Sequence, residues 1–190
     1  MSARNARDPG GAGVGTNITT LDAILASYKA DIGVDFEGYR NHAYRVANLC
    51  LAQRPRDDTT IEKIAIAAAF HDLGIWTDQT FDYLEPSVAL AMEYLADRGM
   101  GRWAPEIAAM IREHHKITRY RGDPDWLVEP FRRADWCDVT LGALSFGMPR
   151  GAIHAIQAAW PDAGFHRLLV RLELRHLRKH PLNPVPVLRW

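Results

Sequence analysis

Cysteine, net charge and long apolar segments are all scarce in this sequence. The two cysteines, Cys50 and Cys137, lie far apart and form no CxxC pair, which argues against a disulfide framework or a cysteine zinc site. The 23 basic and 23 acidic side chains cancel, so no overall field favours a nucleic acid polymer or an anionic membrane as partner. The longest apolar run, from Ile64 to Phe70, is much shorter than the roughly 20 residues of a membrane-spanning helix. These features predict a cytoplasmic protein with a small-molecule substrate, and leave homo-oligomerisation open.

Alternation of polar and apolar residues, the pattern of a half-buried strand, is nearly absent as well. Apolar residues instead recur at helical spacing, in segments bounded by Pro, Gly or capping residues. This pattern predicts helices near 21–30, 36–53, 59–72, 85–99, 105–114, 127–138, 149–159 and 165–180. An all-α, single-domain helical bundle follows, and a chain of 190 residues with 47% hydrophobic composition can bury a substantial core.

The two ends of the chain differ in composition from the rest. Residues 1–17 are rich in glycine and nearly free of large apolar side chains, so they predict a flexible leader. The helical domain is expected over residues 18–180. The last segment, 181–190, reads PLNPVPVLRW and predicts an extended, proline-rich tail.

Imidazole and carboxylate groups fall on the inward faces of several predicted helices. His42 shares an apolar stripe with Tyr39, the pair His71-Asp72 ends a long apolar helix, and Asp135 lies on or beside the stripe of a later helix. Burying such groups without partners costs several kcal/mol in total. One shared metal ion would remove this cost, because imidazole nitrogen and carboxylate oxygen are suitable ligands for divalent ions.

The order of these residues resembles the HD superfamily of metal-dependent phosphohydrolases, whose motif is a histidine, a His-Asp pair and a distant aspartate. The resemblance covers about residues 36–144. It implies a bundle of the HD type with the metal centre between core helices. It also implies that His42, His71, Asp72 and Asp135 are the ligands of a divalent ion such as Mn, Fe, Co, Ni, Zn or Mg. The motif does not name a substrate.

Further residues widen the predicted site. His114-His115 looks like the adjacent histidine pair found in members with two or three metals, and Glu85 stands where many members have a histidine before a helix. A carboxylate can also ligate a borderline ion. A second metal held by Asp72, Glu85 and His114 is therefore a hypothesis, and the number of ions stays open.

The reaction expected from the resemblance is hydrolysis of a phosphate ester. Divalent ions lower the pKa of bound water and clamp phosphate oxygens, so that hydroxide attacks phosphorus in line. The predicted catalytic residues are Asp72, His114 and Lys116. Side chains near these residues that can hold the substrate through charge or hydrogen bonds are Arg119, Arg121 and His115.

Four functions remain open at this point. The first is a phosphohydrolase acting on a nucleotide or another small phosphate ester. The others are a di-iron oxygenase, a hydratase or amidohydrolase-like enzyme, and a metal-stabilised binding module without turnover. Members of the superfamily that hydrolyse cyclic di-GMP have a Gly-Tyr-Pro triplet after their paired histidines. The corresponding segment here reads HHKITRYRGDP, which disfavours that substrate.

Overall fold

The computed structural model describes residues 14–79 and 82–179, and within them the chain is all-helical. The predicted tail and residues 1–13 of the predicted leader lie outside this described part. The elements, in chain order, are α1 (Thr19–Ser27), α2 (Lys29–Ile32), η1 (Gly33–Asp35), α3 (Phe36–Leu51), α4 (Asp58–Phe70), α5 (Gly74–Thr77), α6 (Leu84–Asp97), η2 (Gly101–Trp103), α7 (Ala104–Glu113), α8 (Val128–Val139), α9 (Arg150–Ala159) and α10 (Phe165–Lys179). The predicted all-α bundle is thus confirmed.

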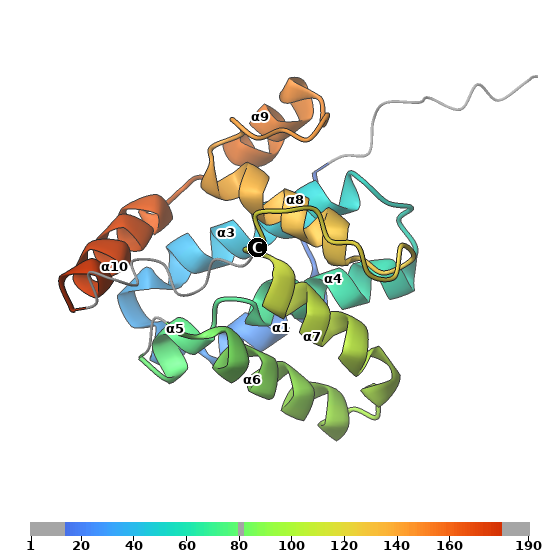
Figure 1. Cartoon of the computed structure of the whole chain (residues 1–190), viewed down its shortest axis with the longest axis horizontal. Coiled ribbons are helices and arrows are strands. Elements are labelled where there is room, and N and C mark those ends of the chain that lie inside the picture. Colours follow the sequence, from blue (N-terminus) through green and yellow to red (C-terminus); the bar gives the residue numbers. More distant parts are fainter. Residues whose placement is uncertain (1–13, 80–81, 180–190) are drawn as a thin grey trace, which may run out of the picture.

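Helix α3 is the central element. It lies beside α8 and also packs against α4. Helices α6 and α7 pair along the lower edge of the view, whereas α9 lies at its top and α10 at its left (Figure 1). Almost every α3 residue from Gly38 to Leu51 is buried, because neighbouring helices surround it. A polar side chain on α3 therefore has to find its partner inside the protein.

The chain before α1 is also attached to α3. The backbone N–H of Gly15 donates to Oδ1 of Asn48 at 2.6 Å, and Nδ2 of Asn48 donates to the Gly15 carbonyl at 3.0 Å. Residues 14–17 belong to the predicted leader, yet Gly15 is hydrogen-bonded to the core helix.

The turn after α4 positions the His-Asp pair. Helix α4 starts after Asp57, whose side chain accepts the Thr60 N–H, and it ends at Phe70, so that His71 and Asp72 lie in the following turn. Gly74 then opens α5. A Cβ atom at Gly74 would lie 2.6 Å from the Tyr83 carbonyl oxygen, so only glycine allows the start of α6 to pack this closely.

In the described part of the chain, no helix combines the length and the apolar character needed to cross a membrane.

Candidate metal centre

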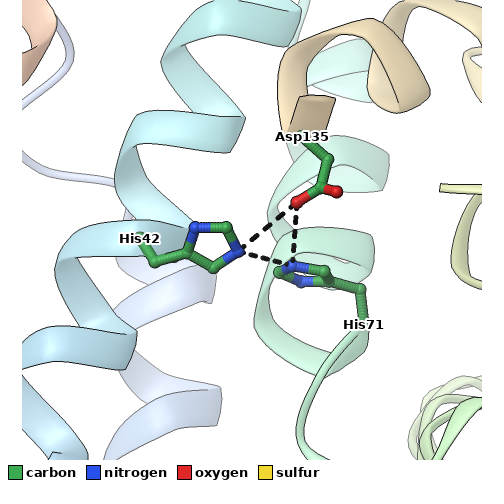
Figure 2. A group of neighbouring side chains, drawn as sticks. All are labelled: His42, His71 and Asp135. Carbon is green, nitrogen blue, oxygen red and sulfur yellow. Dashed lines mark hydrogen bonds and ion pairs between the residues drawn. The ribbon is translucent and has the colours of Figure 1, made fainter. Parts of the chain in front are cut away.

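The four residues of the predicted motif come together between α3, α4 and α8. Each side chain of His42, His71, Asp72 and Asp135 is exposed by 3% or less. Nε2 of His42 lies 2.9 Å from Nε2 of His71 and 3.5 Å from Oδ1 of Asp135, and Figure 2 shows these three side chains pointing toward one another. Oδ2 of Asp72 lies 3.4 Å from Nε2 of His71. The structure therefore places all four in one group.

Two further histidines join this group from the end of α7. Nε2 of His114 lies 3.4 Å from Oδ1 of Asp72, and Nδ1 of His115 lies 3.6 Å from Oδ2 of Asp135. The other ring nitrogen of His115 is 2.7 Å from the hydroxyl of Tyr83. We call the six residues the His/Asp cluster; its members are His42, His71, Asp72, His114, His115 and Asp135.

Hydrogen bonds outside the cluster fix the tautomers of three imidazoles. Nδ1 of His71 donates to the Ala68 carbonyl at 2.9 Å, and Nδ1 of His114 donates to the Ile111 carbonyl at 2.7 Å. A carbonyl can only accept, so both Nδ1 atoms carry the proton. Nδ1 of His42 lies 2.7 Å from a carboxylate oxygen of Asp138, which is also an acceptor. In the neutral rings, all three Nε2 atoms then present lone pairs to the centre of the cluster.

The carboxylates add more acceptors to the same space. Four buried cluster atoms have no hydrogen-bond partner among the described residues: Oδ1 of Asp72, both carboxylate oxygens of Asp135 and Nε2 of His114. A proton on His114 would serve one oxygen of Asp72 and leave both Asp135 oxygens unpartnered. Lone pairs and negative charges this close together repel one another unless a cation lies between them.

The pKa values follow from this crowding. Burial lowers the pKa of His71 to about 3 and raises the pKa of Asp135 to about 6, since it penalises the charged form of each. Burial also acts on Asp72, but the imidazoles of His71 and His114 outweigh it and hold the pKa of that carboxyl well below its usual range. For His114 the nearby Asp72 and Asp135 carboxylates overcome burial and raise its pKa. The pKa values of the two aspartates are thus shifted in opposite directions within one site.

Asp138 supports the cluster from one layer further out. Its carboxylate contacts Nδ1 of His42 and also accepts two hydrogen bonds from the buried guanidinium of Arg45, at 2.6 and 2.9 Å. Burial alone would raise its pKa, but His42 and Arg45 lower it to about 2. Asp138 therefore orients His42 as a charged acceptor, a common arrangement behind metal-binding histidines. This role of Asp138 was not predicted from the sequence. Asp138 follows Asp135 by three residues and Arg45 follows His42 by three, which puts each pair on one helix face.

Glu85 does not join the cluster. Its side chain is 59% exposed, and its two oxygens accept from Nε and Nη2 of Arg112 at 2.8 and 2.7 Å. Glu85 lies in the first turn of α6, where an acidic residue also suits the helix dipole. The structure thus gives no support to the predicted second metal at Asp72, Glu85 and His114, and His71 lies with Asp72 and His114 in place of Glu85.

The predicted basic residues Lys116, Arg119 and Arg121 are not members of the His/Asp cluster. Nζ of Lys116 lies 3.7 Å from a carboxylate oxygen of Glu113. Arg119 and Arg121 line a cavity of about 780 Å³ that none of the cluster residues lines. Of the predicted substrate-binding residues, only His115 is part of the cluster.

The donor set fits a divalent cation. Three overlapping triads have ligand atoms within 4.8 Å of one another: His42, His71 and Asp135; His71, Asp72 and His114; and His114, His115 and Asp135. A set of four imidazoles and two carboxylates suits Zn, Mn, Fe, Co or Ni. The unpartnered acceptor atoms are the groups that a cation would satisfy.

Comparisons with family models, with curated proteins and with solved structures found no match to this chain.

Proposed function

We propose that this protein is a divalent-metal-dependent hydrolase that acts on a nucleotide or another small phosphate ester, as the resemblance to the HD superfamily implies. The observation that carries the proposal is the set of buried imidazole and carboxylate acceptors that face one another without donors. Such a set is costly without a cation and becomes favourable with one.

The cluster offers more donors than one closed site needs. A structural zinc site has four ligands, whereas a catalytic site keeps a position open for water or substrate. Here six side chains form overlapping triads. Nδ1 of His71 and of His114 donates to a backbone carbonyl, so each of these rings could bind one ion only, through Nε2. We assign His42, His71 and Asp135 to a first ion, and Asp72 and His114 to a second; a carboxylate is the type of ligand that two ions could share.

Bound divalent ions supply a nucleophile by lowering the pKa of coordinated water, and they neutralise the phosphate oxygens. The protein contributes orientation and a dry environment. Asp138 holds the ring of His42, and the carbonyls of Ala68 and Ile111 hold those of His71 and His114. Each Nε2 is therefore aimed inward before any ligand arrives.

The substrate is expected to approach past His115. Its side chain is 16% exposed, in contrast to the other five members of the cluster. Burial lowers the pKa of His115 well below its usual range and raises the pKa of Tyr83 well above its own, so the pair of ring nitrogen and phenol is neutral near pH 7. These two groups can hydrogen-bond an incoming ester without adding charge.

The test begins with elemental analysis of the purified protein, followed by phosphate release from a panel of nucleotides and sugar phosphates with Mn, Fe, Co, Ni, Zn or Mg added. We expect at least one bound transition metal and metal-dependent phosphate release. The matched control is His154→Ala, because His154 is exposed on α9 and outside the cluster. A loaded protein that releases no phosphate from any ester would contradict the hydrolase, and oxygen uptake with bound iron would favour an oxygenase.

Deep burial also favours a second candidate, a metal-stabilised module without turnover. Five of the six cluster side chains are nearly inaccessible, as in closed structural sites. This candidate predicts a large gain in melting temperature on metal loading, with no substrate turned over in the same panel.

A further inference from the structure

The cavity beside the loop after α7 is a second polar region, separate from the His/Asp cluster. Its volume is about 780 Å³, within the range of pockets that bind small organic ligands. Its walls come from residues 52–54 directly after α3, the segment around 119–126, the first half of α8 and the segment before α9. No cluster residue lines it, so an occupant would not contact the proposed metal ions.

Positive charge dominates this cavity. Four guanidinium groups line it against two carboxylates, those of Asp123 and Glu129. The Arg54 guanidinium donates to the carbonyls of Pro124 and Trp126 at 3.2 and 3.5 Å. These partners are neutral, so they fix the side chain without cancelling its charge. Because guanidinium groups bind phosphate and carboxylate well, the cavity favours an anion.

Two of the arginines are held less firmly. Arg119 and Arg121 are exposed, and they lie on the loop that follows the paired histidines. Asp123, the nearest acid in sequence, also lines the cavity and accepts the Asp125 backbone N–H, but no ion pair joins it to either arginine among the described residues. The carboxylate of Glu129 is engaged as well, because it accepts from Arg132, Arg133 and the Tyr120 backbone N–H. These contacts leave the charges of Arg119 and Arg121 to solvent or to a ligand.

The start of α9 adds a third source of positive potential. Gly147, Met148 and Pro149 line the cavity immediately before this helix. Pro149 is the N-cap and provides no side-chain hydrogen bond to the helix, and the first turn contains no acidic residue. The positive end of the helix dipole is therefore not compensated by the chain itself.

Aromatic surface completes the cavity. Tyr120 and Trp126 are half-buried and line it, and the guanidinium of Arg133 lies 6.0 Å from the centre of the Phe146 ring. Flat rings beside arginines suit a ligand that combines a planar heterocycle with an anionic group.

We propose that this cavity binds a nucleotide, with its phosphate held by Arg119 and Arg121 and its base against Tyr120 and Trp126. The site is independent of the hydrolase proposed above, because it shares no residue with the His/Asp cluster. Its occupant would be bound and not hydrolysed there.

The experiment is calorimetric titration of the full-length protein with three probes: inorganic phosphate, adenosine, and the methylenephosphonate analogue of AMP, in which carbon replaces the ester oxygen and prevents hydrolysis. We expect the analogue to bind at least about tenfold more tightly than either of the other probes, since both parts of the cavity contribute. Phosphate that binds as tightly as the analogue would overturn the nucleotide assignment.

The paired variant R119A/R121A tests the location. Both side chains are exposed, so the fold should persist, which circular dichroism checks. We expect at least about tenfold weaker binding of the analogue, whereas R175A/R178A, which removes two exposed arginines from α10, should change the affinity less than about twofold. Unchanged binding by R119A/R121A would overturn the proposal. If a metal chelator abolishes the binding that R119A/R121A retains, the analogue occupies the His/Asp cluster, and this result would also overturn the proposal.

Discussion

The His/Asp cluster gathers hydrogen-bond acceptors and carboxylates, whereas the cavity lined by Arg119 and Arg121 gathers hydrogen-bond donors and positive charge. In the cluster, lone pairs and carboxylate oxygens face one another within a buried space. In the cavity, guanidinium groups and an uncapped helix start face an open space. The first arrangement calls for a cation and the second for an anion. Hydrogen-bonding groups that the fold leaves unsatisfied therefore indicate the chemistry of the ligand that would satisfy them.

The two regions also differ in how firmly they are built. Cluster side chains project from helices or helix ends, and Asp138 or backbone carbonyls hold the rings of His42, His71 and His114. The exposed arginines of the cavity come from a loop. Substitutions in the cluster should therefore affect both metal affinity and folding, whereas those in the cavity should affect binding alone.

The largest expected effect comes from Asp135→Asn. The substitution keeps the shape of a buried ligand and removes its charge, so metal affinity should fall by more than about 100-fold, since even the loss of an outer partner costs 10–100-fold. The amide can donate to a cluster acceptor, so the metal-free variant should melt at a higher temperature than the metal-free wild type. Elemental analysis and calorimetric melting measure the two effects.

A variant that loses metal and is also less stable without it would contradict this view of the cluster. His154→Ala, the exposed α9 variant, serves as the control and should retain both the metal content and the melting temperature of the wild type.

Asp138→Asn should have the next largest effect. The change removes the charge that pairs with buried Arg45 and holds His42. An uncompensated buried arginine costs about 3–5 kcal/mol, and the loosened His42 should lower metal affinity by about 10–100-fold. Urea unfolding measures the first quantity, and competition with a chelator measures the second.

Asp97→Asn is the matched control for Asp138→Asn, because Asp97 is an exposed acid at the end of α6. If Asp138→Asn proves as mild as this control, Asp138 does not position His42.

The pH dependence should be weaker and has a defined sign. The pKa of Asp135 is raised to about 6 in the folded, metal-free protein, so the proton competes with metal below that pH. Metal affinity at Asp135 should fall by up to about tenfold per pH unit below 6. His114, whose pKa is raised by the nearby carboxylates, adds proton competition that begins at higher pH, whereas His71, with its pKa lowered to about 3, does not compete over this range.

The same titration acts on the metal-free fold in the opposite direction. Because the folded protein binds the Asp135 proton more tightly than the unfolded chain, this contribution is complete below the ordinary pKa near 4. It is lost as pH rises through 6, by at most about 3 kcal/mol. The difference between the wild-type and Asp135→Asn unfolding curves at pH 4 to 7 measures it, because the buried His71 and His115, whose pKa values are lowered, add a slope of opposite sign to both proteins. Equal slopes in the two proteins would assign the dependence to groups other than Asp135.

Helical periodicity predicted the cluster well but the cavity poorly, for a physical reason. Inward-facing positions on α3 and α8, and the end of the apolar run in α4, place His42, Asp135 and His71 in the core, because burial and helix geometry constrain each other. Arg119 and Arg121 follow His115 closely in sequence, which favoured one common site. A loop can turn its side chains away from the preceding helix, and no periodicity reports the turn.

Glu85→Gln should have the smallest effect, and it tests whether Glu85 is a metal ligand or only the ion-pair partner of Arg112. Sequence position made Glu85 a candidate ligand, whereas the structure pairs it with exposed Arg112. An exposed ion pair is worth less than about 1 kcal/mol, so the variant should keep its metal content and lose little stability. Elemental analysis of Glu85→Gln and Asp135→Asn, prepared in the same way, compares their metal contents. If Glu85→Gln lost metal as Asp135→Asn does, Glu85 would have to leave Arg112 when the ion binds, and the start of α6 would move toward the cluster.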